Sequence, residues 1–321
     1  MGSSEHLAQK PQIRLVLAAP RGFCAGVERA IRIVELALQK FGPPVFVRHA
    51  IVHNVHVVER LARLGAVFVD ELDWVPDGGT VIFSAHGVSK AVSGGARRRG
   101  LRILDATCPL VSKVHAEVER HHSAGRHVLL IGHAGHPEIE GTMGQIPPGA
   151  VTLIENLDDV AAFTPTDPGH LAYATQTTLS VDDAKDLVNA LRRRFPNIEG
   201  PRKQDVCYAT TNRQQAIKMV AAEADIVLII GSPASSNAQR LVEAARRGGR
   251  RRSVLIDSAA DIDWRSIAMA RMVAISAGAS TPESLVGEVV EAFRARYEVT
   301  VEEVGAARED VIFNVPRALV G

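Results

Sequence analysis

The chain has 321 residues, of which 46% are hydrophobic and 23% charged, a composition that excludes a disordered or fibrous protein. Lys and Arg number 37 against 36 Asp and Glu, so the net charge of +1 gives no overall field to attract nucleic acid or an anionic membrane. No apolar stretch approaches the roughly 20 residues that cross a bilayer, and residues 1–11 lack a signal-type apolar core. We therefore expect a cytoplasmic protein of two or three packed domains, with neither nucleic acid nor membrane as a partner.

The predicted elements begin with a strand over residues 14–19, a tight turn over 22–26 and an amphipathic helix over 27–40. Cys24 lies in the turn of this strand-loop-helix unit. It is one of only three cysteines, an odd number spread along the chain. Three scattered cysteines cannot form a disulfide framework, so we expect them to have another role.

The strand-loop-helix pattern returns twice. Cys108 lies between a predicted strand over 101–105 and a helix over 110–121, and Cys207 precedes a helical stretch over 212–224. The spacing of the cysteines suits small α/β domains and is too long for solenoid repeats. The sequence therefore predicts three similar α/β domains and a C-terminal tail, over residues 12–107, 108–206, 207–296 and 297–321.

Each domain contains two further apolar stretches that end in polar residues. They are strands expected over residues 45–47, 80–83, 127–131, 171–174, 226–230 and 272–275. In parallel α/β sheets, ligands bind beyond the carboxyl ends of the strands. If the three domains pack around a pseudo-threefold axis, all these strand ends face one place, with three cysteines and a ring of His, Ser, Thr and Asn at its centre.

The cysteines allow several interpretations. A single cysteine is most often a small buried hydrophobe, which explains three in equivalent loops poorly. Cys24 could be a lone catalytic thiolate, because it precedes a helix whose dipole lowers a thiol pKa. None belongs to a CxxC pair, which disfavours a local zinc site. If one thiolate comes from each domain, the three soft ligands select zinc, copper(I) or an iron-sulfur cluster, and a cluster would keep one open iron.

The polar residues at the strand ends are of the kind that hold phosphate oxygens. They include His53, His86, His136, Thr178, Ser235, Asn237 and Ser280. A single histidine is more often structural, so the functional interpretation depends on their shared position. No GxxxxGK[ST] loop and no GxGxxG after a strand is present, so neither ATP nor a Rossmann-bound dinucleotide is supported. Glu138 is the one carboxylate among these strand-end residues, and it either transfers a proton or caps a helix.

Seven segments together resemble the IspH/LytB family of 4-hydroxy-3-methylbut-2-enyl diphosphate reductases. They occur in family order from about residue 14 to about residue 290. The segments are Pro20–Val27, Ser84–Ser89, Asp105–Val111, Gly132–Gln145, Gln176–Ser180, Cys207–Gln214 and Ser235–Asn237. The sequence departs from the family in one loop, where Pro233 and Ala234 stand in place of more polar residues.

The resemblance implies three α/β domains around a pseudo-threefold axis with a central iron-sulfur cluster. It implies that Cys24, Cys108 and Cys207 hold one 4Fe-4S cluster per chain, with one iron open to the substrate. The implied reaction is the two-electron, two-proton reductive dehydroxylation of 4-hydroxy-3-methylbut-2-enyl diphosphate to isopentenyl and dimethylallyl diphosphate, which ends the methylerythritol phosphate route to isoprenoids. Glu138 would deliver a proton, with Thr177 orienting the hydroxyl.

The resemblance also implies a diphosphate site and an electron donor. The diphosphate would be held by His53, His86, His136, Thr178, Ser235, Ser236, Asn237 and Ser280. Nothing in the sequence binds a flavin or nicotinamide, so a ferredoxin or flavodoxin would supply the electrons, docking on one of the arginine-rich surfaces. Two alternatives stay open: a cluster-holding regulatory or binding protein without catalysis, and a transferase that uses only the Cys24 thiolate.

Overall fold

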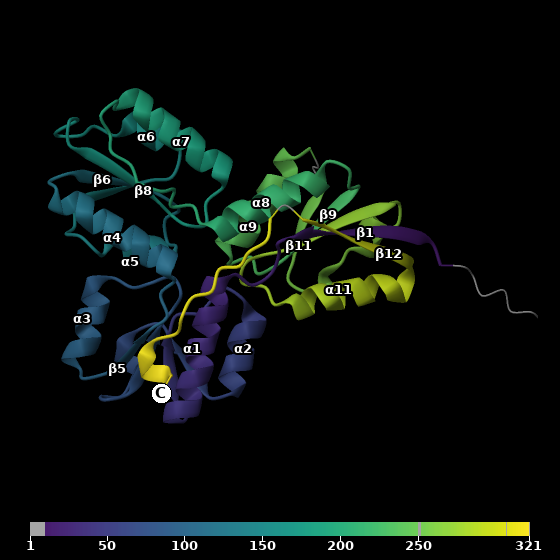
Figure 1. The fold of residues 1–321 in the computed structure, drawn as a ribbon, viewed down its shortest axis with the longest axis horizontal. Coiled ribbons are helices and arrows are strands. Elements are labelled where there is room, and N and C mark those ends of the chain that lie inside the picture. The colour runs from purple at the N-terminus through teal and green to yellow at the C-terminus, as the bar shows by residue number, and fades with distance from the viewer. Residues whose placement is uncertain (1–9, 250–251, 306, 321) are drawn as a thin grey trace, which may run out of the picture. The chain divides into compact units, whose positions relative to one another are not determined.

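The computed structural model describes residues 10–249, 252–305 and 307–320 (Figure 1). In these residues every strand pairing is parallel, and the strands form separate sheets of five, four and three strands. The expected class of parallel α/β sheets is thereby confirmed. No helix in the described part of the chain is long and apolar enough to span a bilayer.

The chain divides into two compact units. The first comprises the residues up to Gly22 together with Asn212–Glu309, and the second comprises Phe23–Thr211 with the residues from Asp310 on. The five-stranded sheet belongs to the first unit. The four-stranded and three-stranded sheets both belong to the second.

The first unit is a sheet with the order β10-β9-β11-β1-β12 and helices on both faces. Its strands are β1 (Gln12–Ala19), β9 (Ile226–Ile230), β10 (Ser253–Ile256), β11 (Met272–Ala277) and β12 (Glu298–Gly305). Its helices are α8 (Tyr208–Ala221, whose first turn lies in the second unit), α9 (Ser236–Arg247), α10 (Trp264–Ile267) and α11 (Glu283–Arg296), with a short 3-10 helix η2 (Ala259–Asp261). Side chains alternate along β1, so Leu15 packs in the core on the α11 side and Val16 in the core on the α8 and α9 side.

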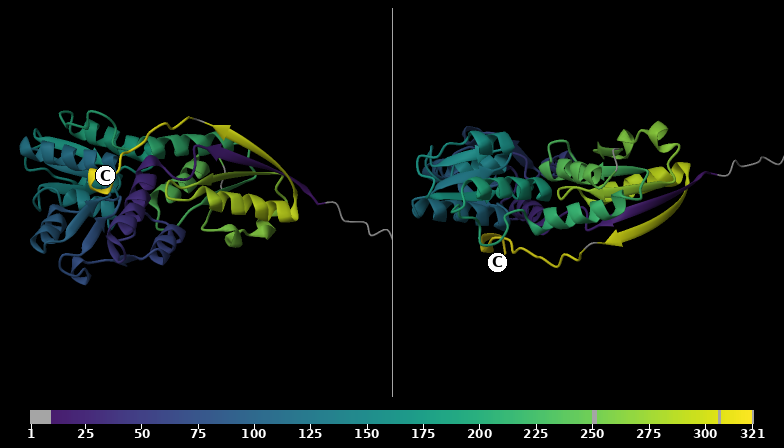
Figure 2. Two further views of the ribbon diagram at one scale, coloured as in Figure 1. Left: turned by 60° about the horizontal axis from the view of Figure 1, so that its bottom comes forward. Right: turned by 90° about the horizontal axis from the view of Figure 1, so that it is seen from above.

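Strand β1 is an inner strand of this sheet, although the sequence placed it at the start of a first domain. It pairs with β11 on one side and with β12 on the other, where Gln12 is opposite Glu298. Both views in Figure 2 show β1, in purple, beside β12, in yellow. Strand β12 falls in the segment that we expected to be a tail. It is mostly exposed and rich in glutamate, so backbone pairing rather than apolar burial holds it at the sheet edge.

One half of the second unit is a sheet with the order β3-β2-β4-β5. Its strands are β2 (Val45–Arg48), β3 (Ala66–Val69), β4 (Thr80–Phe83) and β5 (Arg102–Asp105), and its helices are α1 (Ala25–Phe41), α2 (Val55–Arg63) and α3 (Lys90–Arg98). Two 3-10 helices, η1 (Leu72–Trp74) and η3 (Arg317–Leu319), pack beside it. Along β4, Ile82 packs against α1 while Val81 packs toward α3.

The other half of the second unit is a sheet with the order β7-β6-β8. It consists of β6 (His127–Ile131), β7 (Val151–Ile154) and β8 (Leu171–Thr175), with helices α4 (Pro109–Ser123), α5 (Pro137–Met143), α6 (Leu157–Ala162) and α7 (Val181–Arg194). Figure 1 shows α6 and α7 on one face and α4 and α5 on the other. Two apolar cores result, one on each face.

Besides β12, three strands and one loop differ from the sequence predictions. β3, β7 and β10 were not expected; each lies at a sheet edge, where less apolar surface is buried. A strand ahead of Cys207 was expected, and this prediction was wrong. Residues 200–207 form a loop, because Pro201 and the charged residues after it are unsuited to a buried strand. Helix α8 also begins at Tyr208, earlier than predicted.

Candidate active site

Each of the three cysteines immediately precedes a helix of the structure. The carbonyl oxygens of Cys24, Cys108 and Cys207 accept hydrogen bonds from the amides four residues later, at 3.0, 2.9 and 3.0 Å. This is the backbone geometry of a helix N-cap, here at α1, α4 and α8. All three cysteines are half-buried and lie in the second unit, so one compact body fixes their relative positions.

Two of the thiols converge on Gly26 in the first turn of α1. A Cβ atom built on Gly26 would lie 2.7 Å from Sγ of Cys108 and 3.8 Å from Sγ of Cys24. The third thiol lies within electrostatic range of them. Burial raises the pKa of the Cys108 thiol to about 12, and the nearby thiols of Cys24 and Cys207 also raise it. The three thiols therefore share one neighbourhood.

The raised thiol pKa values favour metal binding over nucleophilic catalysis at this site. Burial raises the pKa of Cys207 to about 11, against a hydrogen-bond contact of 3.2 Å between its Sγ and Oγ1 of Thr210. Buried thiols with pKa values this high are poor nucleophiles at neutral pH, whereas a metal centre replaces their protons. Within the described residues, no group of three or more His, Cys, Asp or Glu could hold a single metal ion. Three soft thiol ligands in one neighbourhood suit a multinuclear cluster better.

Three predicted histidines lie against one another in the second unit. The ring centroids of His53 and His86 are 4.2 Å apart, and that of His136 lies 5.5 Å from the first and 5.6 Å from the second. They come from the loop after β2, the loop after β4 and the N-cap of α5. The carboxyl ends of strands in two different sheets thus supply one cluster of imidazoles.

These histidines are neutral at pH 7. Burial lowers the pKa of His53, takes that of His86 well below its usual value and lowers that of His136 to about 4; neighbouring histidines lower each of them further. Nδ1 of His136 accepts a hydrogen bond from the backbone N–H of Glu138 at 3.1 Å. The neutral His136 ring therefore carries its proton on Nε2, where it can be donated to an anion.

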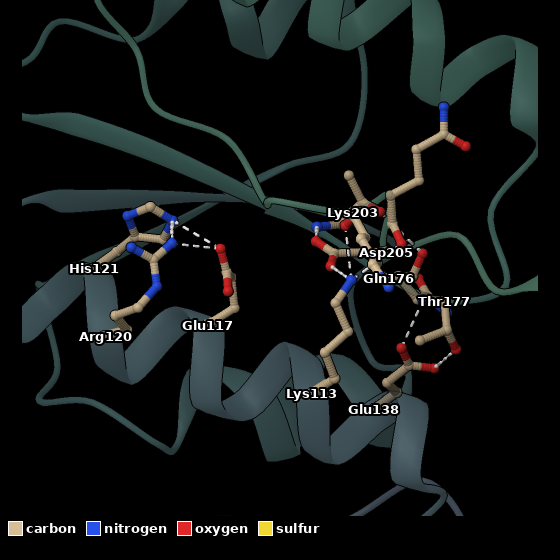
Figure 3. A network of polar contacts seen from close by, with 11 residues as sticks. Lys113, Glu117, Arg120, His121, Glu138, Gln176, Thr177, Lys203 and Asp205 are labelled. Atoms are coloured by element: carbon tan, nitrogen blue, oxygen red, sulfur yellow. Dashed lines mark hydrogen bonds and ion pairs between the residues drawn. The ribbon is translucent and has the colours of Figure 1, made fainter.

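Glu138 is buried in the first turn of α5 and is held by Thr177 (Figure 3). Its Oε1 accepts from the backbone N–H of Thr177 at 2.6 Å, and its Oε2 accepts from the Thr177 hydroxyl at 2.9 Å. Burial raises the pKa of Glu138 to about 7; the two hydrogen bonds lower it and the nearby charge of Asp205 raises it. A carboxyl balanced in this way can give or take a proton at neutral pH.

Asp205 and Lys113 are two residues of this network that the sequence analysis did not single out. Oδ2 of Asp205 accepts from the backbone N–H of Thr175 at 3.0 Å, and Oδ1 accepts from Nζ of Lys113 at 3.0 Å. The Lys113 ammonium also donates to two carbonyl oxygens of residues 203 and 204. These contacts, drawn in Figure 3, fix the loop that leads to Cys207. The only feature of the sequence that could have pointed to Asp205 is its position two residues before Cys207.

The remaining predicted residues lie in two places. Thr178 follows Thr177 in the turn after β8 in the second unit, where its Oγ1 accepts from Nε2 of Gln176 at 3.1 Å. Four buried residues form a group in the first unit, at the carboxyl ends of β9 and β11: Ser235, Ser236, Asn237 and Ser280.

Hydrogen bonds hold the group in the first unit together. Ser280 donates to Oγ of Ser235 at 3.4 Å, and Oδ1 of Asn237 accepts from the backbone N–H of Ala279 at 2.8 Å. Ser235 is also the N-cap of α9, its Oγ accepting from the backbone N–H of Ala238. The predicted residues therefore form two groups, one within each unit.

Comparison with known proteins gives matches over most of the chain. The sequence profile of the family described as LytB protein matches residues 15–294. The 4-hydroxy-3-methylbut-2-enyl diphosphate reductase of Paracoccus denitrificans is 61% identical over 311 residues, which are 97% of this chain and 98% of the relative. The protein of the same name from Hyphomonas neptunium is 59% identical over 315 residues, 98% of this chain and 100% of the relative.

Two solved structures are also similar. The E-1-hydroxy-2-methyl-but-2-enyl-4-diphosphate reductase of Plasmodium falciparum matches with a TM-score of 0.90 and 36% identity over 97% of each chain. A structure described as (E)-4-hydroxy-3-methyl-but-2-enyl diphosphate reductase, the terminal enzyme of the non-mevalonate pathway, matches with a TM-score of 0.63 and 30% identity. It covers 88% of this chain and 99% of that chain.

Proposed function

The chain belongs to the LytB family, and from this we infer that it is a 4-hydroxy-3-methylbut-2-enyl diphosphate reductase. The observation in the structure that carries the inference is Glu138. This buried carboxyl has a pKa of about 7 and shares one compact unit with three half-buried thiols. A proton donor and a set of soft ligands are the two features that a reductive dehydroxylation requires of the protein.

The reaction consumes two electrons and two protons. They break the allylic C–O bond, form one new C–H bond and release the oxygen as water. The second proton can add at either end of the allyl group, which gives isopentenyl diphosphate and dimethylallyl diphosphate. This step is the last of the methylerythritol phosphate route to isoprenoids, and the enzyme is an oxidoreductase.

We propose that Cys24, Cys108 and Cys207 hold one 4Fe-4S cluster with one iron free of protein ligands. The shared neighbourhood of the three thiols and the convergence of two of them on Gly26 support this assignment. When bound, the cluster would supply electrons and a Lewis acid for the substrate hydroxyl. Burial raises the pKa values of the Cys108 and Cys207 thiols, and the neighbouring thiols raise them further, so a bound metal centre would replace protons that these thiols otherwise keep.

The proposed architecture is three α/β domains around a pseudo-threefold axis with this cluster at the centre. Three separate parallel sheets, each with helices on both faces, support it. The proposed divisions after residues 107 and 206 separate the sheets of the second unit from each other and from α8. Strands β1 and β12 join the sheet of the third domain in this scheme.

Glu138 acts as the proton donor in this proposal, and Thr177 positions it. The Thr177 hydroxyl donates to Glu138, which leaves the lone pairs of its oxygen available to accept from the substrate hydroxyl. Burial favours the protonated form of Glu138, so the residue enters the reaction as an acid. The two hydrogen bonds from Thr177 then stabilise the carboxylate that remains after the proton has left.

The diphosphate is assigned to neutral donors. They are His53, His86, His136, Thr178, Ser235, Ser236, Asn237 and Ser280. Neutral imidazoles can donate hydrogen bonds to phosphate oxygens, and the negative charge of a diphosphate raises their pKa values, so they can also share a proton with it. The electrons come from a separate carrier protein, a ferredoxin or a flavodoxin.

Anaerobic purification with iron and acid-labile sulfide assays tests the function. We expect about four of each per chain, a visible absorption that dithionite bleaches and the substrate shifts, and turnover with dithionite as reductant. A cluster without turnover would instead favour a regulatory or binding protein. An iron-free protein that still reacted through Cys24 would favour thiol chemistry.

A further inference from the structure

Helix α7 borders a groove of about 420 Å³ in the second unit. Its basic lining residues are Lys185 and Arg192 from the helix and Arg202 from the loop that follows, and all three are exposed. The one carboxylate in the lining, Asp205, has a fully buried side chain paired with Lys113. The groove therefore presents positive charge to the solvent.

The opposite side of α7 has the opposite charge. A second hollow there, of about 380 Å³, is lined by carboxylates of α7, of the loop before α6 and of the first turn of α6. They are Glu155, Asp158, Asp183 and Asp186, with no Lys or Arg among the lining residues. The two hollows beside α7 therefore have linings of opposite charge. An anionic partner would be attracted to the groove and repelled from the hollow on the other side.

The basic groove adjoins the loop that carries one of the cysteines. Asp205 and Val206 line the groove, and Cys207 is the next residue. Thr175 at the end of β8 also lines it, and the backbone N–H of Cys207 donates to the carbonyl oxygen of Thr177 at 3.0 Å. A molecule bound in the groove therefore rests against the backbone that leads directly to a proposed cluster ligand.

We propose that this groove, defined by Lys185, Arg192 and Arg202, is the docking surface for a small acidic electron-carrier protein. The proposal depends on the proposed function, because a reductase of this kind needs an external source of two electrons. A one-electron carrier would dock twice per turnover and leave oxidised each time. Two reduced carriers and two protons then balance the loss of the hydroxyl as water and the formation of one C–H bond.

Charge complementarity makes such a surface effective. Opposite charges steer diffusional encounter and fix the orientation of the partner, and transient electron-transfer complexes have small interfaces in which a few charges matter. Among the described residues, the side chains of Lys185 and Arg202 make no hydrogen bond and no ion pair. Both cations are therefore available to a partner.

Charge reversal with two reductants tests the proposal. The double variant Lys185→Glu with Arg202→Glu is compared with Arg97→Glu, a reversal at an exposed arginine of α3 in the same unit. Each holoenzyme is assayed with a purified acidic [2Fe-2S] ferredoxin and, separately, with dithionite. We expect the double variant to lose about tenfold or more in kcat/KM for the ferredoxin at low salt, with less loss at high salt. Dithionite-driven turnover should match that of the native chain.

The outcomes separate the docking surface from the function itself. An unchanged kcat/KM for the ferredoxin in the double variant, or an equal loss in the Arg97→Glu control, would overturn the docking surface while leaving the reductase intact. No turnover of the native chain with either reductant would refute the proposed function instead. A double variant with lower activity with dithionite as well would show that the groove residues act on the site and not on the carrier.

Discussion

Both carboxylate oxygens of Glu138 accept hydrogen bonds from Thr177, one from its backbone N–H at 2.6 Å and the other from its hydroxyl at 2.9 Å. Glu138 follows β6 and Thr177 follows β8, two neighbouring strands of one parallel sheet. The pair therefore links two strand ends, where α/β proteins bind their ligands. Because one hydrogen bond comes from the backbone, a substitution at Thr177 removes only part of the support for Glu138.

Glu138→Gln should retain the iron and bind the substrate but turn over about 100-fold or more slowly with dithionite, because glutamine cannot donate the proton. Glu140→Gln is the matched control, since Glu140 lies on the same short helix and is exposed. Iron content, substrate-induced absorption changes and turnover should be measured for both variants. Turnover of Glu138→Gln at the native rate would exclude Glu138 as the acid.

The rate of the native enzyme should fall as the pH rises through about 7. Glu138 is active in its protonated form, and with a pKa of about 7 that form decreases from about 90% at pH 6 to about 10% at pH 8. Thr177→Val removes the hydroxyl hydrogen bond, which lowers the pKa of Glu138, so the descending limb should move to higher pH while the maximal rate drops. Identical pH profiles for the two proteins would contradict this coupling.

The sequence predicts the positions of these residues along the chain better than their contacts. Cys24 and Cys108 could be placed ahead of helices, because helix starts and strand ends are local features of the sequence. The contact between the rings of His53 and His86 depends instead on how two loops pack. The same is true of Asp205, whose partners Thr175 and Lys113 lie far from it in the sequence.

The fold could be predicted as far as its buried strands. β4, β6 and β9 have the predicted bounds because each is a short apolar run. β12 could not be found in this way, since its side chains are mostly exposed and its hydrogen bonds go to β1 at the other end of the chain. A sheet edge with little apolar surface leaves only a weak periodic signal in the sequence.

Gly26→Ala should lower the iron content without unfolding the protein. The new Cβ would lie 2.7 Å from Sγ of Cys108, so the thiol would have to move. Gly287→Ala in α11 is the control, because nothing lies within 4 Å of a Cβ there and alanine favours a helix by up to about 1 kcal/mol. Iron per chain and Tm should be compared. Full iron content in Gly26→Ala would show that the two thiols do not hold the cluster at this glycine.

Arg213→Met should lower the free energy of unfolding by about 3–5 kcal/mol. The guanidinium of Arg213 is buried; it donates to the carbonyl oxygen of Gly22 at 3.1 and 2.9 Å and to the carboxylate of Glu309 at 3.0 and 3.1 Å. Gly22 and Glu309 are the residues at which the chain leaves the first unit. The Arg213 side chain therefore holds both of these chain segments in place.

An exposed ion pair in the same unit provides the comparison for Arg213. Arg14 and Glu302 pair at 2.7 Å with side chains 47% and 48% exposed, and Arg14→Met should cost no more than about 1 kcal/mol. Urea unfolding of both variants measures the difference. Equal losses would mean that the buried guanidinium has no special role in holding the two chain crossings together.

His115→Gln should make the stability of the protein less sensitive to acid. Burial lowers the pKa of His115 to about 4, against a usual value of 6.5. The unfolded chain therefore takes up this proton more readily than the folded chain. Stability is full above pH 6.5 and is lost as the pH falls from 6.5 to 4, by about 3 kcal/mol for this group. Urea unfolding of both proteins at pH 5 and pH 8 tests this: the difference at pH 8 reflects packing alone, and at pH 5 it should shift in favour of the variant. A difference independent of pH would show that His115 does not titrate on unfolding.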